Sequence, residues 1–169
     1  MKIGERTTAN HEHADAGTFQ IFYKGLYTGE SGLYDKYGST HFTFYHQATV
    51  AHNGLLVYNT NLYSSQVDEN GVPNNAKRYW YSGGQRDPGE SGTLWDWLDA
   101  SEYDTGEVTG VEYEINEDGT ADYAYLAGDI TAAYAQETVD YVGRRMFTLY
   151  TGNEDFPMYF IVYDRITSD

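Results

Sequence analysis

Apolar and polar residues alternate along most of this chain with a period of two. Such alternation is typical of β-strands that bury one face, whereas an amphipathic helix repeats every 3.6 residues. Residues 18–25 show the pattern clearly, with Phe19, Ile21 and Tyr23 on one predicted face. We expect further strands at residues 54–63, 77–82, 108–116, 121–128, 139–150 and 158–166.

Turn residues separate these predicted strands, and no long helical pattern competes with them. Asp118-Gly119 indicates a hairpin between the strands at 108–116 and 121–128. Residues 130–136 predict one or two helical turns, and residues 83–103 are expected to be irregular. Many short strands with little helix predict an all-β domain, an antiparallel β-sandwich of two packed sheets. At 169 residues, we expect residues 1–169 to form a single domain.

The charge balance argues against two classes of partner. Twenty-six acidic residues against ten basic ones give a formal net charge of −16. Without a local basic patch, that charge repels nucleic acid and an anionic membrane surface, so we expect neither as a partner. No apolar run approaches the roughly 20 residues that span a bilayer, and the N-terminus lacks a signal-peptide pattern. Because cysteine is absent, any metal must be held by imidazole and carboxylate groups.

Histidines are concentrated in the first third of the chain. All five lie there: His11, His13, His41, His46 and His52. His11 and His13 are two residues apart, so on an extended chain they project to the same face. Together with Glu30 and His52 from separate segments, they match the nitrogen and oxygen ligands that Zn²⁺ accepts. The spacing alone is equally compatible with ordinary hydrogen-bonded histidines on a half-buried face.

Short motifs occur along the chain in an order typical of one known family. They are N-H-E-H-A-D-A-G at 10–17, E-S-G at 30–32, T-V-A-H-N at 49–53, D-Y-A-Y-L-A-G-D-I-T-A-A-Y at 122–134, G-R-R-M-F around Arg145, and F-I-V-Y-D-R-I-T-S at 160–168. Together they resemble the C-terminal β-sandwich domain of the heparinase II/III-like polysaccharide lyases, which include related alginate lyases. The resemblance runs from about residue 3 to residue 168.

The resemblance implies one structural Zn²⁺ per chain, held by His13, Glu30 and His52. Glu30 departs from the aspartate that is usual in the family and is one methylene longer. An arginine that the family often carries shortly before T-x-A-H-N is also missing, and Gln47-Ala48 stands there instead.

The resemblance also implies which residues face the substrate. Asn10 and His11 correspond to the asparagine-histidine pair at the cleft, and Tyr34 and Tyr37 follow the E-S-G motif. We therefore expect His11 and Tyr34 to be catalytic, and Asn10 and Tyr37 to bind substrate.

Lyases of this family cleave uronate-containing polysaccharides by β-elimination. A base removes the C5 proton, the uronate carboxylate is neutralised, and an acid protonates the leaving oxygen. In the family, a helical toroid that precedes the sandwich supplies the tyrosine for proton transfer, and this chain contains no toroid. We therefore expect a trimmed sandwich portion that is inactive or very weak alone and needs the toroid of the same or another chain. A periplasmic or secreted location is implied, and an uncovered docking patch would favour a homodimer.

Two other interpretations remain open. Tyrosine (18) far outnumbers phenylalanine (7), and its amphipathic ring suits stacking against sugars as well as a sheet surface. The chain then would be a non-catalytic sandwich that binds carbohydrate or a partner protein. Alternatively, the zinc site only holds the sandwich together, and the chain has no activity of its own.

Overall fold

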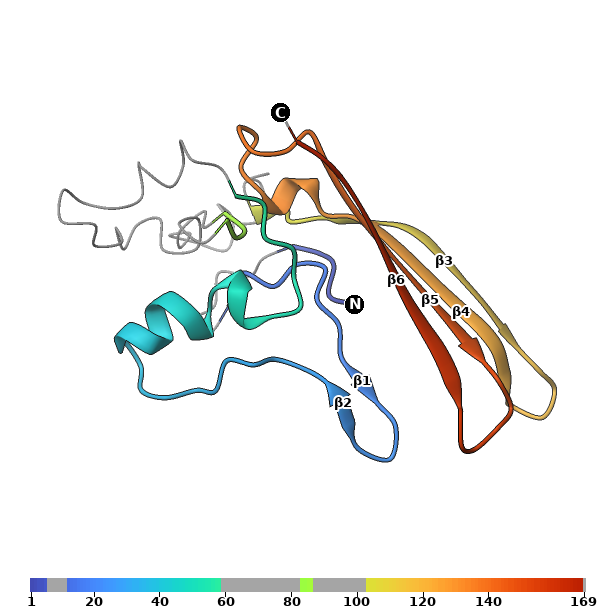
Figure 1. The fold of residues 1–169 in the computed structure, drawn as a ribbon. Helices are drawn as coiled ribbons and strands as arrows, with labels where there is room; N and C mark the ends of the chain where they lie inside the picture. Colours follow the sequence, from blue (N-terminus) through green and yellow to red (C-terminus); the bar gives the residue numbers. More distant parts are fainter. Residues whose placement is uncertain (6–11, 59–82, 87–102, 169) are drawn as a thin grey trace, which may run out of the picture.

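Two antiparallel sheets make up the regular structure of the chain. The computed structural model describes residues 1–5, 12–58, 83–86 and 103–168. Within these residues, one sheet has two strands and the other has four, and helix is limited to three short segments (Figure 1). The predicted all-β class with little helix is therefore confirmed.

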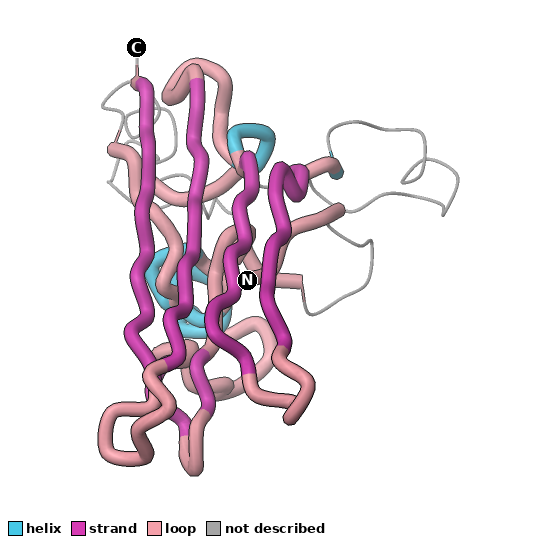
Figure 2. The backbone as a smooth tube through the Cα atoms, turned by 90° about the vertical axis from the view of Figure 1, so that its right-hand side faces the viewer, coloured by secondary structure: helices cyan, strands magenta, loops and turns pink. Residues whose placement is uncertain are grey.

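The larger sheet is built from strands that follow one another along the chain. These are β3 (Glu107–Ile115), β4 (Ala121–Asp129), β5 (Tyr141–Tyr150) and β6 (Met158–Thr167), which pair in the order β3-β4-β5-β6 (Figure 2). The predicted hairpin joins β3 to β4, where the amide of Asn116 donates a hydrogen bond of 2.7 Å to the carbonyl of Thr120. The four predicted C-terminal strands thus lie within two residues of their observed bounds.

The smaller sheet corrects the prediction of one continuous strand at residues 18–25. The chain reverses there and forms a hairpin of β1 (Ile21–Phe22) and β2 (Leu26–Thr28). Lys24 at the turn has a φ of 54°, which a non-glycine residue rarely adopts. The predicted alternation of faces still holds, because Ile21 is half-buried and Phe22 is exposed.

Another predicted strand, at residues 54–63, is not formed in its described half. Residues 54–58 are assigned to no strand, and the amide of Val57 donates a single backbone hydrogen bond of 2.8 Å to Gly83. A ladder needs repeated bonds of this kind with one partner strand. The remainder of that prediction, the strand at 77–82 and most of the irregular segment 83–103 lie outside the described residues. Residues 83–86 form no helix or strand, as expected.

Three short helical segments complete the described fold. η1 (Phe42–His46) was not predicted, whereas η6 (Thr131–Ala133) confirms the helical turn expected within residues 130–136. η2 (Thr49–Ala51) is a single turn between them. Among the described residues, no helix combines the length and apolar composition needed to cross a bilayer.

The N-terminal part packs against one face of the four-stranded sheet, which we call the inner face. The ring of Phe19 lies 5.1 Å from that of Phe160 on β6. The main core lies at one end of this face, around Ile130 and Val142, neither of which is exposed. In Figure 2 the described N-terminal segments lie behind the sheet, so none of them covers the opposite, outer face. Because the second sheet has only two short strands here, the full sandwich remains a prediction.

Candidate metal centre

The E-S-G motif brings Glu30 beside the segment that carries His52. The amide and the hydroxyl of Ser31 both donate hydrogen bonds of 2.9 Å to the carbonyl of Ala51. Gly32 allows this approach, since a Cβ there would lie 2.9 Å from the Ala51 Cβ and 3.1 Å from the His46 Cα. The serine and the glycine of the motif therefore fix the position of Glu30.

The A-H-N motif attaches His52 to the segment that follows the first histidine motif and precedes β1. Asn53 mimics a peptide group: its side-chain amide donates to the carbonyl of Phe19 at 2.8 Å, and its Oδ1 accepts from the Phe19 amide at 3.0 Å. η2 ends just before His52, whose amide donates to the carbonyl of Thr49 at 3.0 Å. These bonds leave the His52 ring facing inward.

His13 is held by a loop that is fastened to Gln47. The amide of Ala14 donates to the carbonyl of Gln47 at 2.9 Å, and the Gln47 side chain donates to the carbonyl of Glu12 at 3.3 Å. Ala14 and Ala48 pack together and are buried. The family resemblance implies an arginine near this position, and Gln47 lies there instead. Gln47 is buried, and its hydrogen bonds hold the loop that carries His13.

These three segments bring the predicted metal ligands together. One ligand atom each from His13, Glu30 and His52 lie within 4.8 Å of one another. His52 Nδ1 is 3.7 Å from Glu30 Oε1, and the rings of His13 and His52 have centroids 5.2 Å apart. This group could hold a metal ion. The prediction that these three residues lie together in a group able to hold a metal ion is therefore confirmed.

The surroundings of His52 fit a bound cation. Its side chain is fully buried, and neither ring nitrogen has a hydrogen-bond partner. An unsatisfied buried polar atom costs about 1–3 kcal/mol, so the site favours a group that can engage these nitrogens. Bonds of about 2.0–2.1 Å to a tetrahedral zinc place two ligand atoms roughly 3.3 Å apart, close to the observed separation from Glu30.

Both histidines of the candidate site favour the neutral form, which is the form that can bind a metal. Burial lowers the pKa of His13, and the neighbouring imidazoles of His52 and His46 lower it further. Burial likewise lowers the pKa of His52, although the charges of Asp15 and Glu30 oppose the change. A neutral imidazole keeps the nitrogen lone pair that a metal requires.

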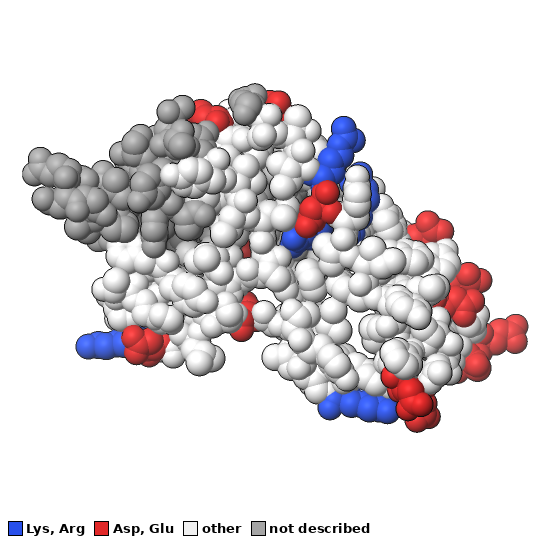
Figure 3. Space-filling model, viewed as in Figure 1, with Lys and Arg blue, Asp and Glu red and all other residues white. Residues whose placement is uncertain are grey.

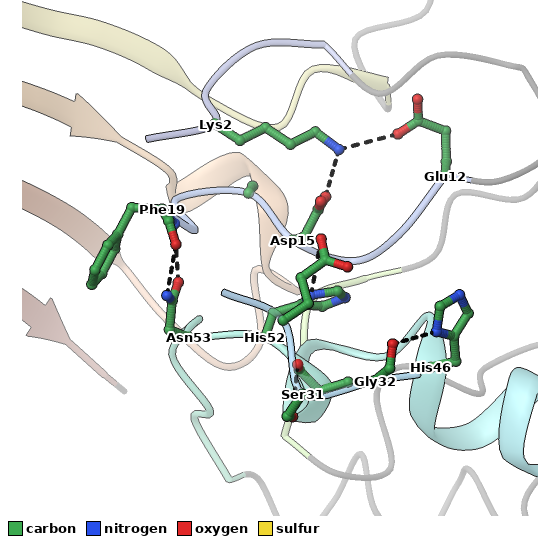
Figure 4. A network of polar contacts seen from close by, with 12 residues as sticks. Lys2, Glu12, Asp15, Phe19, Ser31, Gly32, His46, His52 and Asn53 are labelled. Carbon is green, nitrogen blue, oxygen red and sulfur yellow. Dashed lines mark hydrogen bonds and ion pairs between the residues drawn. The ribbon is translucent and has the colours of Figure 1, made fainter. Parts of the chain in front are cut away.

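An ion-pair network borders the histidines, and no sequence motif indicated it. The Lys2 ammonium lies 2.6 Å from the Asp15 carboxylate and 3.4 Å from that of Glu12 (Figure 4). Burial disfavours the charged form of Lys2, but the hydrogen bond and charge of Asp15 outweigh it and raise the pKa of the ammonium. Asp15 is buried and adds negative charge beside His52, which further favours a cation there.

His46 lies next to the ligand group and is not part of it. Its Nδ1 lies 2.9 Å from the carbonyl of Gly32, and because a carbonyl only accepts, Nδ1 carries the proton (Figure 4). Its ring centroid is 4.6 Å from that of His13 and 5.5 Å from that of Tyr34. His46 therefore connects the metal-binding group to an exposed tyrosine, a role that residue spacing did not indicate.

The predicted substrate residues fall into two groups. Tyr34 and Tyr37 are exposed by 57% and 59%, and both rings contact Phe42 of η1. They stand at the surface on the side of His46. Asn10 and His11 lie outside the described residues.

Arg144 joins this region to the four-stranded sheet. Its guanidinium pairs with both carboxylate oxygens of Asp164 at 2.7 and 2.9 Å. Its Nη1 also donates to the carbonyls of Gly17 and Asn53, at 2.9 and 2.7 Å. The carbonyls belong to the two segments that carry His13 and His52, so the sheet positions both histidines. The resemblance drew attention to Arg145, yet the buried arginine is its neighbour.

Comparison of the sequence with models of known protein families found no match, and comparison with curated proteins found none either.

Proposed function

We propose that His13, Glu30 and His52 bind one Zn²⁺ and that the chain is the metal-bearing part of a lyase for uronate-containing polysaccharides. The single observation that supports this is the convergence of three motifs that are remote in sequence into one metal-capable group. Imidazole and carboxylate are ligands that zinc accepts, and the chain has no cysteine to offer instead. When bound, the ion supplies positive charge and holds the three segments in place.

The residues at the surface of the site fit the chemistry of β-elimination. Elimination needs an acid or base near C5 and the leaving oxygen, and a positive or hydrogen-bonding group near the uronate carboxylate. Tyr34 offers a hydroxyl at the surface beside His46, and Tyr37 stands on the same side. With His11 and Asn10 from the N-terminal motif, these residues form one wall of the proposed cleft, and a helical toroid of the same or another chain forms the other.

The first experiment measures metal content in protein purified without chelators or a histidine tag. We expect about one zinc per wild-type chain, and none in His52→Ala. His41→Ala is the matched control, because His41 is exposed and bonds the carbonyl of Leu33 away from the ligand group. Equal zinc in all three proteins would contradict the assignment of ligands.

The second experiment tests the lyase assignment itself. The zinc-loaded chain is titrated with oligogalacturonate while Tyr34 and His46 are followed by NMR, and the product is monitored by the ultraviolet absorbance of unsaturated uronate. We expect binding near Tyr34 that weakens in Tyr34→Ala, with little or no product from the chain alone. Zinc binding without any response of Tyr34 or His46 to glycan would leave the metal with a purely structural role and overturn the lyase proposal.

A further inference from the structure

The outer face of the four-stranded sheet carries aromatic side chains and two arginines. Residues two apart on a strand point to the same side, so Tyr159, Tyr163 and Arg165 of β6 share one face. Asp164 lies between the last two, points the other way and pairs with Arg144 on the inner face. The outward residues of β6 therefore point away from the described N-terminal segments, and Tyr159 and Tyr163 are about 60% exposed.

A tyrosine of the neighbouring strand completes this surface. Tyr141 folds over Gly143, where a Cβ would overlap the tyrosine hydroxyl. The guanidinium of Arg165, whose register partner is Gly143, lies 5.5 Å from the centroid of the Tyr141 ring. The guanidinium of Arg145 also forms a hydrogen bond to Tyr141, which raises the pKa of Arg145. The glycine thus allows one tyrosine to align two arginines.

Charge is distributed unevenly over this face. Glu112 and Glu114 stand on the outer side of the edge strand β3, where Glu112 accepts a hydrogen bond from Tyr123 at 2.8 Å. At the other end, Oδ1 of Asp129 accepts hydrogen bonds from the amide and the hydroxyl of Thr131, at 2.9 and 2.6 Å. Figure 3 shows basic side chains near the upper end of the sheet and acidic ones along its right-hand edge. Both arginines of the outer face therefore lie at one end of it, where Arg165 shares a row across the sheet with Asp129 and Glu107.

We propose that Tyr141, Arg145, Tyr159, Tyr163 and Arg165, the tyrosine–arginine surface, bind a uronate-bearing glycan. Tyrosine rings offer flat apolar faces to sugar rings, and guanidinium groups match carboxylates with two parallel hydrogen bonds. From Tyr159 to Arg165 the strand extends about 20 Å, at roughly 3.3 Å per residue, which is long enough to contact several consecutive sugars.

Charge favours this ligand over a second copy of the chain. Two copies that met through the arginine end would bring four guanidinium groups together, which like-charge repulsion opposes. A polyanionic glycan instead matches the arginines and keeps the tyrosine hydroxyls in water. The surface lies on the opposite side of the sheet from the metal-binding group, so it would hold a long glycan while another part of the same chain reaches the proposed cleft.

The test is calorimetric titration with oligogalacturonate, carried out on zinc-loaded Tyr34→Ala so that the proposed cleft contributes little. We expect saturable binding that weakens about tenfold in Arg165→Gln, the loss of one charge-assisted pair, and several-fold in Tyr163→Ala. Rising salt should weaken it, and a neutral oligosaccharide of equal length should bind far less. These surface variants should fold normally, because the side chains are exposed.

Tyr113→Ala is the matched control. Tyr113 is 63% exposed, comparable to Tyr163, but it lies on the inner face of the edge strand. Equal losses of glycan affinity in Tyr113→Ala and Tyr163→Ala, or no glycan binding by the starting protein, would overturn the proposal. Dimerisation that Tyr163→Ala abolishes, without glycan binding, would assign the surface to a second copy instead. Because zinc content and Tyr34 are measured separately, failure here is distinguishable from failure of the lyase proposal.

Discussion

Arg144 donates a hydrogen bond of 2.7 Å to the carbonyl of Asn53, the residue that follows the buried candidate ligand His52. Arg144 is itself buried and paired with Asp164, so this contact places a rigid group of the sheet directly behind the metal-binding group. The geometry of the site thus depends on residues more than ninety positions further along the chain.

Replacing this arginine should loosen the site as well as the fold. Arg144→Gln leaves the Asp164 carboxylate and two backbone carbonyls without their donor, so we expect a loss of about 2–4 kcal/mol in the free energy of unfolding. Zinc affinity should fall too, because both histidine segments lose their attachment. Urea unfolding and a competitive zinc titration measure the two effects. Arg165→Gln on the outer face should change neither, and a normal zinc affinity in Arg144→Gln would show that the sheet does not position the histidines.

The second prediction concerns the close approach at Gly32. Gly32→Ala places a Cβ against Ala51 and the backbone of His46, and we expect a destabilisation of about 1–3 kcal/mol. Zinc affinity should also fall, since the strain separates Glu30 from His52. Gly25→Ala is the control, because a Cβ there meets nothing within 4 Å. Thermal unfolding with and without zinc distinguishes a general loss of stability from a loss confined to the metal-bound form.

The third prediction concerns the carboxylate ligand. Glu30→Gln keeps the length of the side chain and removes its charge, so zinc affinity should fall at least about tenfold. In the wild type, zinc at about 100 times its dissociation constant should stabilise the fold by about 2.7 kcal/mol, and a chelator should reverse this. Thermal scans with and without zinc provide the measurement, and an equal zinc-induced shift in Glu30→Gln would exclude Glu30 as a ligand.

The fourth prediction concerns the stability of the fold at alkaline pH, which depends on Tyr134. Burial raises the pKa of this phenol to about 12 from an ordinary value of 10.0, and its hydroxyl donates to the carbonyl of Leu55 at 2.9 Å. Between these two values the unfolded chain has lost the proton and the folded chain keeps it, so stability falls as pH rises. Once the pH exceeds both values, the loss in the free energy of unfolding that is due to Tyr134 is about 3 kcal/mol.

Urea unfolding at about pH 9 and about pH 11.5 measures this effect. The decline in stability should be shallower in Tyr134→Phe, which has no proton to lose, and unchanged in Tyr159→Phe, whose ring is 60% exposed. Equal declines in the wild type and Tyr134→Phe would show that other groups cause the alkaline loss.

The sequence predicted the parts of the fold that depend on local pattern. Alternation with a period of two located β3 to β6, and Asp118-Gly119 predicted the hairpin, because both signals arise from neighbouring residues. The β1–β2 hairpin was missed because its turn depends on Lys24 at positive φ, a conformation that no turn motif in the sequence indicates. η1 was missed because its aromatic and β-branched residues favour strands, and tertiary contacts of Phe42 override that preference.

The same distinction applies to the candidate site. His13, Glu30 and His52 were predicted because each belongs to a recognisable motif. Asp15 and Arg144 were not, since their roles depend on burial and on partners remote in sequence. For Arg144, strand alternation offered one signal: of two adjacent arginines on a half-buried strand, one must point inward.

The consecutive order of the four strands has a consequence for how the chain acquires its structure. Each strand pairs with its neighbour along the chain, so the sheet closes only short loops and should form quickly. The contact from Arg144 to Gly17 closes a separation of 127 residues, and its partner Asp164 lies on the last strand of the sheet. During synthesis, the histidine segments therefore emerge first and are ordered last. Their ability to capture a metal should appear only after β6 has joined the sheet.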